Sequence, residues 1–390
     1  MMANAASKVE PKAQSHNLGS DRTSRYLPVA APSFEGNERT YVLDCLESTW
    51  ISSIGTYVES FESAFAKFCG APHAISCCNG TAALHLALLA LDVGAGEEVI
   101  VPTFTFVATA NAVTYCGAQP VFVDCEPDTW NIDPALIEEK ISARTKGIVV
   151  VHLYGHPVDM DPVLAIARRR GLFVVEDAAE AHGAEYKGRR VGGIGDIGTF
   201  SFYGNKILTT GEGGMVVTKD ESLARRVRQL RGQGQDFERR YWFPVIGYNY
   251  RMTNIQAAIG LAQLEKVEWH IERRRENARW YRQFLGGHPM FALQPERPWA
   301  RNAYWMNSVV LSEEFPLARD EAISELAKQG IETRPFFYPM HTLPIYRAHA
   351  AGQAFPVADS VAARGMNLPS SASLTRDDIA YIAEALIGLK

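Results

Sequence analysis

The sequence predicts an α/β protein with a large, mostly parallel β-sheet, followed by a smaller α+β domain. Three observations support this fold class. Between about residues 74 and 217, short apolar runs alternate with helical stretches or loops, as expected for a parallel sheet with helices on both faces. Polar side chains follow several of these runs, at the strand ends where such sheets bind ligands. The pattern changes near residues 286–289, beyond which strands and helices are mixed.

The elements of the first part follow in a regular order. Residues 34–47 and 57–68 have amphipathic helical patterns. Strands are expected where the chain is short and apolar, at 74–76, 98–101, 120–123, 147–152, 172–176, 199–202 and 215–217. Helices are expected at 81–91, 106–115, 134–141, 160–170, 221–230 and 254–284.

The second part is expected to contain strands at 304–311 and 331–333 and helices at 319–329 and 376–387. We therefore divide the 390-residue chain into a flexible N-terminal extension (1–25), a large domain (26–285) and a small C-terminal domain (286–390). The extension is polar and lacks the apolar stretch of a signal peptide or membrane anchor.

The composition excludes several classes of protein. A net charge of -5 argues against nucleic acid as the main partner. An apolar run at 82–93 is interrupted by His85 and is too short to span a bilayer, so no membrane association is expected. Six cysteines occur without paired spacing, which predicts reduced thiols in a cytoplasmic protein.

One lysine, Lys206, lies between an apolar run and a glycine-rich turn. Lysines belong on solvated surfaces, and one held between strand ends tends to lose its proton and become an amine nucleophile. Such an amine suits Schiff-base chemistry on a carbonyl cofactor. A lysine that merely snorkels at a strand end is an equally good interpretation of this stretch taken alone.

Two other strand ends carry residues suited to a flat, phosphorylated molecule. Gly80 and Thr81 open a helix after the first strand, where backbone amides and a hydroxyl can hold a phosphate. An ordinary helix cap explains the same residues. Phe106 follows the second strand and could stack on a ring, although core packing is the commoner role of a phenylalanine.

A cluster of polar residues follows the run that ends at Glu176, namely Asp177, Glu180 and His182. A carboxylate at the end of a buried strand is costly unless it faces a cation, and a protonated pyridine nitrogen would be such a cation. A helix cap would explain one aspartate but not the whole cluster.

Two further motifs have less specific interpretations. Residues 193–198 match the dinucleotide pattern GxGxxG, but a strand rather than a helix follows directly, so no nicotinamide or flavin site is expected. His152 and His156 are four residues apart, but Gly155 and Pro157 would break a helix that aligned their rings. No metal site is therefore expected.

In combination these motifs resemble the pyridoxal-phosphate (PLP) sugar aminotransferases of the DegT–StrS family, which have the fold-type-I, aspartate aminotransferase-like architecture. The resemblance runs from about residue 26 to the C-terminus and rests on NGTAALHLAL, VPTFTFVATANAV, VEDAAEAHGA, FSFYGNK with TTGEGGMV, and GYNYRMTN. Within the family, FSFYGNK followed by TTGEGGM, the aromatic lead into GYNYRMTNIQAAIGLAQLE, and ETRPFFYPMH resemble the GDP-perosamine synthases.

This resemblance implies roles for the candidate residues. Lys206 would bind PLP covalently, and Asp177 would keep its pyridine nitrogen protonated, so that the ring acts as an electron sink. The other cofactor contacts within the same chain would come from Gly80, Thr81 and Ser201 at the phosphate, Phe106 at the ring face and Glu180 near the phenolic oxygen.

The resemblance also implies contacts between subunits. Asn249 would reach the phosphate from the neighbouring subunit, which implies a homodimer with shared active sites, alone or within a dimer of dimers. Candidates for contacts to the sugar nucleotide or the amino donor are His182, Arg251, Arg334, Tyr338 and His341.

The activity implied is transfer of the amino group of L-glutamate to the 4-keto carbon of GDP-4-keto-6-deoxy-D-mannose, giving GDP-perosamine while PLP cycles through pyridoxamine phosphate. His182 departs from the perosamine-type pattern, which usually has leucine there, and this leaves the sugar open. The alternatives are a UDP- or dTDP-linked keto sugar, a PLP-dependent dehydratase and a catalytically silent PLP-binding regulator. Because relatives that dehydrate have histidine in place of the lysine, Lys206 favours transamination.

Overall fold

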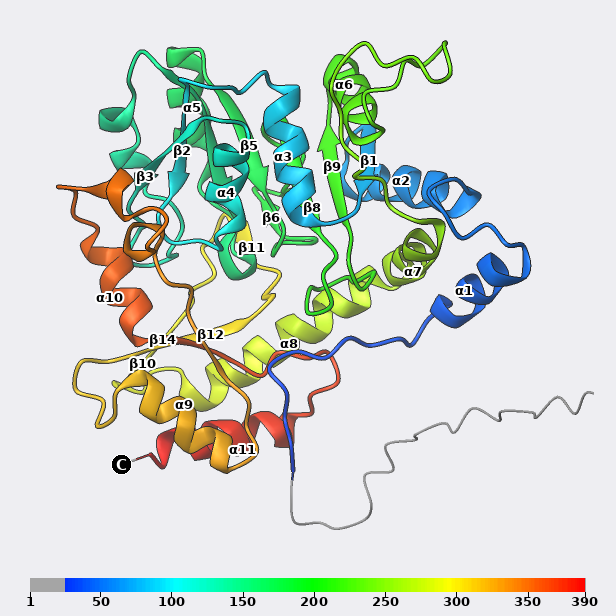
Figure 1. Cartoon of the computed structure of the whole chain (residues 1–390). Coiled ribbons are helices and arrows are strands. Elements are labelled where there is room, and N and C mark those ends of the chain that lie inside the picture. Colours follow the sequence, from blue (N-terminus) through cyan, green and yellow to red (C-terminus); the bar gives the residue numbers. More distant parts are fainter. Residues whose placement is uncertain (1–24, 390) are drawn as a thin grey trace, which may run out of the picture.

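The computed structural model describes residues 25–389 and shows two layered regions joined by a long helix (Figure 1). Apart from Arg25, the predicted N-terminal extension lies outside the described residues. Within residues 25–389, no helix has both the length and the apolar composition needed to cross a bilayer.

The larger region is built on a seven-stranded sheet, which confirms the predicted fold class. Its strand order is β1-β9-β8-β5-β4-β2-β3. The central strands pair in parallel, whereas β9 is antiparallel to both of its neighbours. The strands are β1 (His73–Cys77), β2 (Glu98–Pro102), β3 (Gln119–Val123), β4 (Thr145–Val151), β5 (Phe173–Asp177), β8 (Ile197–Ser201) and β9 (Gly214–Thr218).

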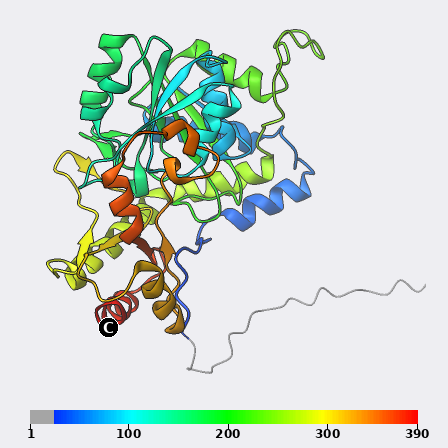
Figure 2. The same cartoon turned by 60° about the vertical axis from the view of Figure 1, so that its left-hand side comes forward.

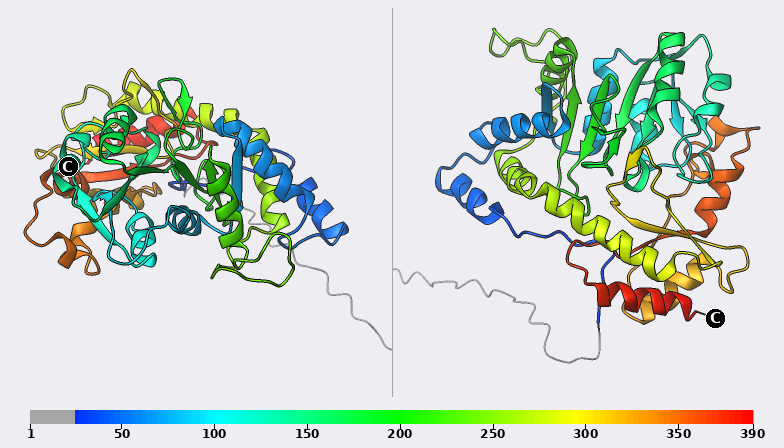
Figure 3. Two further views of the ribbon diagram at one scale, coloured as in Figure 1. Left: turned by 90° about the horizontal axis from the view of Figure 1, so that it is seen from above. Right: turned by 180° about the vertical axis from the view of Figure 1, so that it is seen from behind.

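Helices cover both faces of this sheet, because its strands are buried on both sides and need apolar partners. The two views of Figure 3 show them from above and from behind. These helices are α2 (Thr56–Cys69), α3 (Gly80–Ala90), α4 (Ala108–Tyr115), α5 (Met160–Arg170) and α6 (Glu221–Arg231), while α1 (Glu38–Glu47) packs on α7.

Two helix predictions are wrong in detail. The stretch at 134–141 forms two short 3-10 turns, Pro134–Leu136 and Glu138–Lys140, instead of one α-helix. The predicted helix at 254–284 is two helices, α7 (Asn254–Glu265) and α8 (Val267–Leu285). At Lys266 the backbone leaves the helical region with φ -111° and ψ 16°, and its amide bonds to the carbonyl three residues back, which interrupts the α-helical ladder.

The smaller region contains a four-stranded antiparallel sheet in the order β10-β12-β14-β13. Its strands are β10 (Phe291–Leu293), β12 (Asn307–Leu311), β13 (Arg334–Pro335) and β14 (Gly365–Leu368), and its helices are α9 (Arg319–Lys328), α10 (Pro356–Arg364) and α11 (Arg376–Ile387). The predicted strand at 331–333 is wrong, because Ile331 instead forms a single bridge with Leu27. A third sheet, unforeseen from the sequence, joins β11 (Ala300–Arg301) to β6 (Glu185–Tyr186) and β7 (Arg189–Arg190).

Two hydrophobic cores interleave along the chain. The second core contains Leu27 and the end of α8 together with the C-terminal elements, and Ser370 donates a backbone hydrogen bond to Val29. Conversely, apolar residues between 336 and 362 pack into the first core. Figure 2 shows this orange segment lying against the sheet region. The division of the chain at residue 285 therefore stays a prediction.

Candidate active site

A cavity of about 550 Å³ opens at the carboxyl ends of the parallel strands, between the large sheet and the segments around residues 305 and 335. This is the place where parallel sheets are expected to bind ligands. Its lining includes the predicted residues Gly80, Thr81, Phe106, Asp177, Glu180, Ser201, Lys206 and Arg334. Residues from five different parts of the sequence thus meet in one cavity.

Lys206 lies just beyond the end of β8 and directs its amine into this cavity. Its side chain is 12% exposed, and its Nζ lies 3.8 Å from Glu180 Oε1 and 3.8 Å from the centroid of the Trp305 ring. Burial lowers the pKa of Lys206, although the nearby carboxylates of Glu180 and Asp177 oppose this change. A larger fraction of the amine is therefore neutral, and so nucleophilic, than for an exposed lysine.

Asp177 ends β5 and is buried. Thr109 donates a hydrogen bond of 2.8 Å to Oδ2, and the amide of Ala179 donates one of 3.2 Å to Oδ1. Burial raises the pKa of Asp177, while these hydrogen bonds and the charge of Lys206 lower it. A cation placed beside this carboxylate would satisfy its remaining lone pairs and stabilise its charge.

Glu180 contributes a second buried carboxyl group. The amide of Tyr154 donates a 2.8 Å hydrogen bond to its Oε2, from a turn in which Tyr154 has the left-handed φ of 54°. Burial raises the pKa of Glu180 to about 7, against the lowering effect of Lys206. Glu180 can therefore exchange a proton near neutral pH.

The first turn of α3 and the end of β8 lie against each other in an arrangement that suits an anion. Asn79 caps this helix by accepting a 2.8 Å hydrogen bond from the amide of Ala82. A side chain at position 80 would place its Cβ 2.7 Å from the Cβ of Ser201, so glycine is needed for the close approach. Amides in a first helical turn lack partners within the helix and favour anions, and the hydroxyls of Thr81 and Ser201 lie beside them in the cavity.

Five predicted site residues do not line the cavity of this chain. His182 is buried among Phe65, Phe200 and Phe202, and burial lowers its pKa to about 3. Its imidazole packs into the aromatic core instead of facing the cavity, so its predicted contact with substrate stays a prediction without support from this position. The others are Asn249 and Arg251, which are exposed and hydrogen-bonded to each other, Tyr338, which is exposed, and His341.

His341 instead connects the segment around residue 341 to Thr103, just after strand β2, and to Asp359 of α10. Its Nδ1 lies 2.7 Å from Thr103 Oγ1 and its Nε2 lies 2.8 Å from Asp359 Oδ1, while its ring stacks on Phe355. All of these partners hold it away from the cavity.

The glycine-rich loop that matches GxGxxG binds a carboxylate of the protein itself. Glu176 is fully buried and accepts hydrogen bonds of 2.7 to 2.8 Å from the amides of Gly192, Ile194 and Gly195. His152 Nε2 lies 3.0 Å from the same carboxylate. Burial disfavours the charge, but these hydrogen bonds outweigh it and lower the pKa of Glu176. The prediction that the loop is not a dinucleotide site agrees with this arrangement.

The comparisons with known proteins identify the family. The model of the DegT/DnrJ/EryC1/StrS aminotransferase family matches residues 32–387. The chain belongs to this family.

Similar proteins agree with the assignment. GDP-perosamine synthase of Caulobacter vibrioides is 54% identical over 361 residues, which cover 92% of this chain and 97% of the relative. GDP-perosamine synthase of Escherichia coli O157:H7 is 50% identical over 364 residues, 93% of this chain and 98% of the relative.

Solved structures of similar proteins have the same fold. DesV of S. venezuelae superposes with a TM-score of 0.85 at 37% identity, covering 90% of this chain and 93% of that chain. 3-Amino-5-hydroxybenzoic acid synthase superposes with a TM-score of 0.87 at 31% identity, covering 93% of this chain and 98% of that chain. The protein is thus a PLP-dependent sugar aminotransferase of fold type I.

The cavity of this family member fits PLP chemically. PLP has a phosphate, an aromatic ring with a basic nitrogen, and an aldehyde. The cavity offers an anion site at Gly80, a buried carboxylate at Asp177 and a buried amine at Lys206. Among residues 25–389, no cluster of three or more potential metal ligands occurs.

Sequence reasoning missed two residues of the site. Thr109, which hydrogen-bonds Asp177, lies in the first turn of α4, and its hydroxyl also contacts that of Thr105, which precedes the helix. Nothing in the local sequence distinguishes Thr109 from the other threonines of this stretch. Trp305 covers Lys206 from a segment a hundred residues away, and no local pattern indicates such a long-range contact.

Proposed function

We propose that the protein transfers the amino group of L-glutamate to the 4-keto carbon of GDP-4-keto-6-deoxy-D-mannose, producing GDP-perosamine and 2-oxoglutarate. The observation that carries this proposal is that two GDP-perosamine synthases are at least 50% identical over more than nine-tenths of the chain. We place the reaction in the cytoplasm, and its product in the synthesis of a cell-surface polysaccharide such as an O-antigen of lipopolysaccharide.

The residues that line the cavity would bind the cofactor and transfer the proton during the reaction. Bound PLP supplies an electron sink for the bond that breaks at the amino-bearing carbon. Lys206 would hold the cofactor through its aldehyde and, once released, accept and return the proton at that carbon. Asp177 would pair with the protonated ring nitrogen. The phosphate would be held by Gly80, Thr81 and Ser201, the ring face by Phe106 and the phenolic oxygen by Glu180.

Arg334 is the substrate-binding candidate with the strongest support. It lines the cavity, is exposed and is paired with Glu332 at 3.2 Å. A guanidinium at the mouth of the cavity suits an anionic group, either the carboxylate of glutamate or the diphosphate of the sugar nucleotide.

A homodimer, alone or within a dimer of dimers, would complete the site. Asn249 and Arg251 are exposed and lie outside the cavity of their own chain, as expected of residues that serve a neighbour. Exposed large apolar side chains in α1 and the following loop, and in the loop before Asn249, offer surface for the contact. They are Leu43, Leu46, Trp50, Ile51, Ile54, Phe237, Tyr241, Trp242, Phe243, Val245 and Ile246.

The test is to incubate the purified protein with PLP, L-glutamate and GDP-4-keto-6-deoxymannose, and to identify the nucleotide product by mass. We expect GDP-perosamine with stoichiometric 2-oxoglutarate, and no product from Lys206→Ala, which lacks the reacting amine. Amination of UDP- or dTDP-linked keto sugars in preference to the GDP-linked one would contradict the proposed substrate. Loss of water or ammonia without amino transfer, or no half-reaction with glutamate, would contradict transamination itself.

A further inference from the structure

We propose that Trp305 is a further active-site residue whose indole face stabilises the positively charged form of the Lys206 amine, and that the buried pair Gln294 and Asn302 holds the indole in this position. The inference deepens the proposed function, because it rests on Lys206 being the reacting amine. An indole suits this task, since its face attracts a cation but cannot take the proton from it.

Trp305 contacts the reacting atom directly. Lys206 Nζ lies over its ring at 3.8 Å from the centroid, within the range of a cation–π contact. The indole is 4% exposed, and at such a desolvated site the attraction is stronger than in water. Its Nε1 donates a 2.8 Å hydrogen bond to the carbonyl oxygen of Asn205, which fixes the ring beside the residue that precedes the lysine.

A buried polar network fixes the backbone that leads into Trp305. The amide of Tyr304 donates a 2.7 Å hydrogen bond to Asn302 Oδ1, and Asn302 Nδ2 donates one of 3.1 Å to Gln294 Oε1. Gln294 Nε2 in turn donates to the carbonyl oxygen of Leu153 at 3.2 Å. Asn302 and Gln294 are 0% and 3% exposed, so water cannot replace these bonds.

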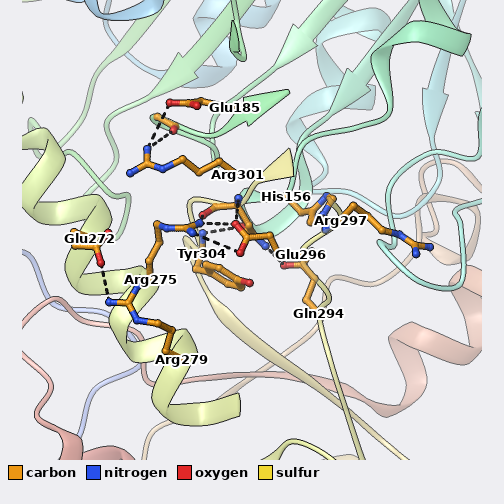
Figure 4. Close-up of polar contacts among 12 residues, drawn as sticks. His156, Glu185, Glu272, Arg275, Arg279, Gln294, Glu296, Arg297, Arg301 and Tyr304 are labelled. Atoms are coloured by element: carbon orange, nitrogen blue, oxygen red, sulfur yellow. Dashed lines mark hydrogen bonds and ion pairs between the residues drawn. The ribbon is translucent and has the colours of Figure 1, made fainter. Parts of the chain in front are cut away.

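The same network is anchored on α8. Arg275 forms an ion pair with Glu296 at 2.5 Å, and Glu296 Oε1 accepts the amide of Asn302 at 2.8 Å. Figure 4 shows Arg275 reaching from α8 toward Glu296, with Gln294 and Tyr304 beside them. The segment before Trp305 is therefore held from both sides.

The backbone around this segment admits little displacement. Tyr304 has a φ of 48°, a left-handed conformation that a tyrosine adopts only when its surroundings enforce it. A Cβ at Gly155 would lie 2.8 Å from the backbone nitrogens of Tyr304 and Trp305, so these two segments of the backbone are in close contact. This turn also presents the Tyr154 amide to Glu180, which joins the network to the second group facing Lys206.

Several charged groups act on the lysine besides the indole. Glu180 lies 3.8 Å from Nζ, and Asp177 is the next carboxylate that acts on it, while the charge of Lys206 helps to lower the pKa of the buried imidazole of His182. Glu212 and Arg334 line the same cavity. The carboxylates also favour the ammonium form, but Glu180, with a pKa of about 7, competes with the amine for the proton.

The test measures the pKa of the Lys206 amine in the full chain freed of cofactor, from the pH dependence of its acetylation rate read by peptide mass. Trp305→Leu removes the ring, and we expect the pKa of Lys206 to fall by about half to one and a half units, the size of a desolvated cation–π contact. Trp305→Phe keeps a ring face, so a smaller fall is expected. Trp280→Leu is the matched control, because Trp280 faces Arg273 outside the cavity.

An unchanged or raised pKa in Trp305→Leu would overturn the proposal, since a rise would mean that the indole only excludes water. Asn302→Ala tests the positioning role, and we expect the pKa of Lys206 to fall there as well. If Asn302→Ala lowers only the melting temperature and leaves the titration of Lys206 unchanged, the positioning role is wrong. Borohydride reduction of the wild-type holoenzyme locates the PLP-bearing lysine separately. Reduced PLP attached to a lysine other than Lys206 would overturn the proposed function, but not the contact between Lys206 and Trp305.

Discussion

At the scale of single residues, Glu180 couples the stability of the cofactor-free chain to pH. Its pKa in the folded chain is about 7, above the ordinary value of 4.5, so folding favours the protonated form. The stabilisation from this group is complete below about pH 4.5 and is lost as pH rises through 7. Above that range a buried charge opposes folding.

Glu180→Gln should therefore stabilise the cofactor-free protein at alkaline pH. The amide oxygen can still accept the Tyr154 amide, whereas no charge forms. We expect the unfolding free energy of the variant, measured relative to that of wild type, to be up to about 3 kcal/mol higher at pH 8 than at pH 4.5. Urea denaturation at both pH values measures this difference. The exposed Glu139→Gln is the control, and an equal response of both variants would refute the assignment to Glu180.

At this scale, the sequence predicted residues that line the cavity where they lie at or shortly after the end of a parallel strand. Asp177, the last residue of β5, and Lys206, in the turn shortly after β8, both line the cavity because parallel strand ends converge on one edge of the sheet. His182 was not predictable in the same way. A helical or turn position leaves the direction of the side chain to tertiary packing, and here three phenylalanine rings receive it.

At the scale of elements, the glycine-rich loop that precedes β8 is attached to the neighbouring strand β5 through Glu176. Three amides and one imidazole nitrogen converge on one carboxylate. Only the ionised carboxylate, in which both oxygens accept hydrogen bonds, can bind all four of these nitrogens. In Glu176→Gln the amide group would direct its own N–H bonds at these donors. Since a buried unmatched polar group is costly, we expect a loss of about 3 kcal/mol in unfolding free energy at pH 7.

The pH dependence distinguishes a charge effect from a packing effect at this loop. Because the pKa of Glu176 is lowered by folding, its stabilisation is present at neutral pH and is lost as pH falls below the ordinary carboxyl pKa. The gap between wild type and Glu176→Gln should therefore narrow in acid, as followed by urea denaturation monitored by circular dichroism. A gap that stays constant with pH would mean that the charge of Glu176 contributes nothing.

The strands of the large sheet and the longer helices were predictable from pattern, but short elements and most element ends were not. The sheet strands are apolar and short and were found within a few residues. The break between α7 and α8 at Lys266 has no proline or glycine to mark it. The two-residue strands β6 and β7 form a tight hairpin, and β11 exists only because a distant segment pairs with β6. Such features depend on tertiary contacts rather than local preference.

At the scale of the whole molecule, the proposed sharing of active sites between subunits predicts complementation between two inactive variants. Lys206→Ala and Asn249→Asp would damage residues contributed to a site by different subunits. Co-expressed in equal amounts, they should form heterodimers with one intact site, giving about a quarter of the wild-type activity if subunits pair at random. Steady-state transamination by the purified mixture measures this recovery.

The matched control pairs Lys206→Ala with Asp177→Asn. Both residues line the cavity of one chain, so every site in that mixture stays defective and no recovery is expected. Equal activity of the two mixtures would show that Asn249 does not serve the neighbouring site.

The interleaved cores also determine the order in which the chain can finish folding during translation. The segment from Leu27 to Ala31 is among the first made, yet its partners are Ile331, Ser370 and Ser371. The ribosome needs tens of seconds to add the 340 residues that separate Ala31 from Ser371. Leu27 can pair with Ile331 only once that residue has been made, and the contacts with Ser370 and Ser371 form only as the last residues leave the exit tunnel.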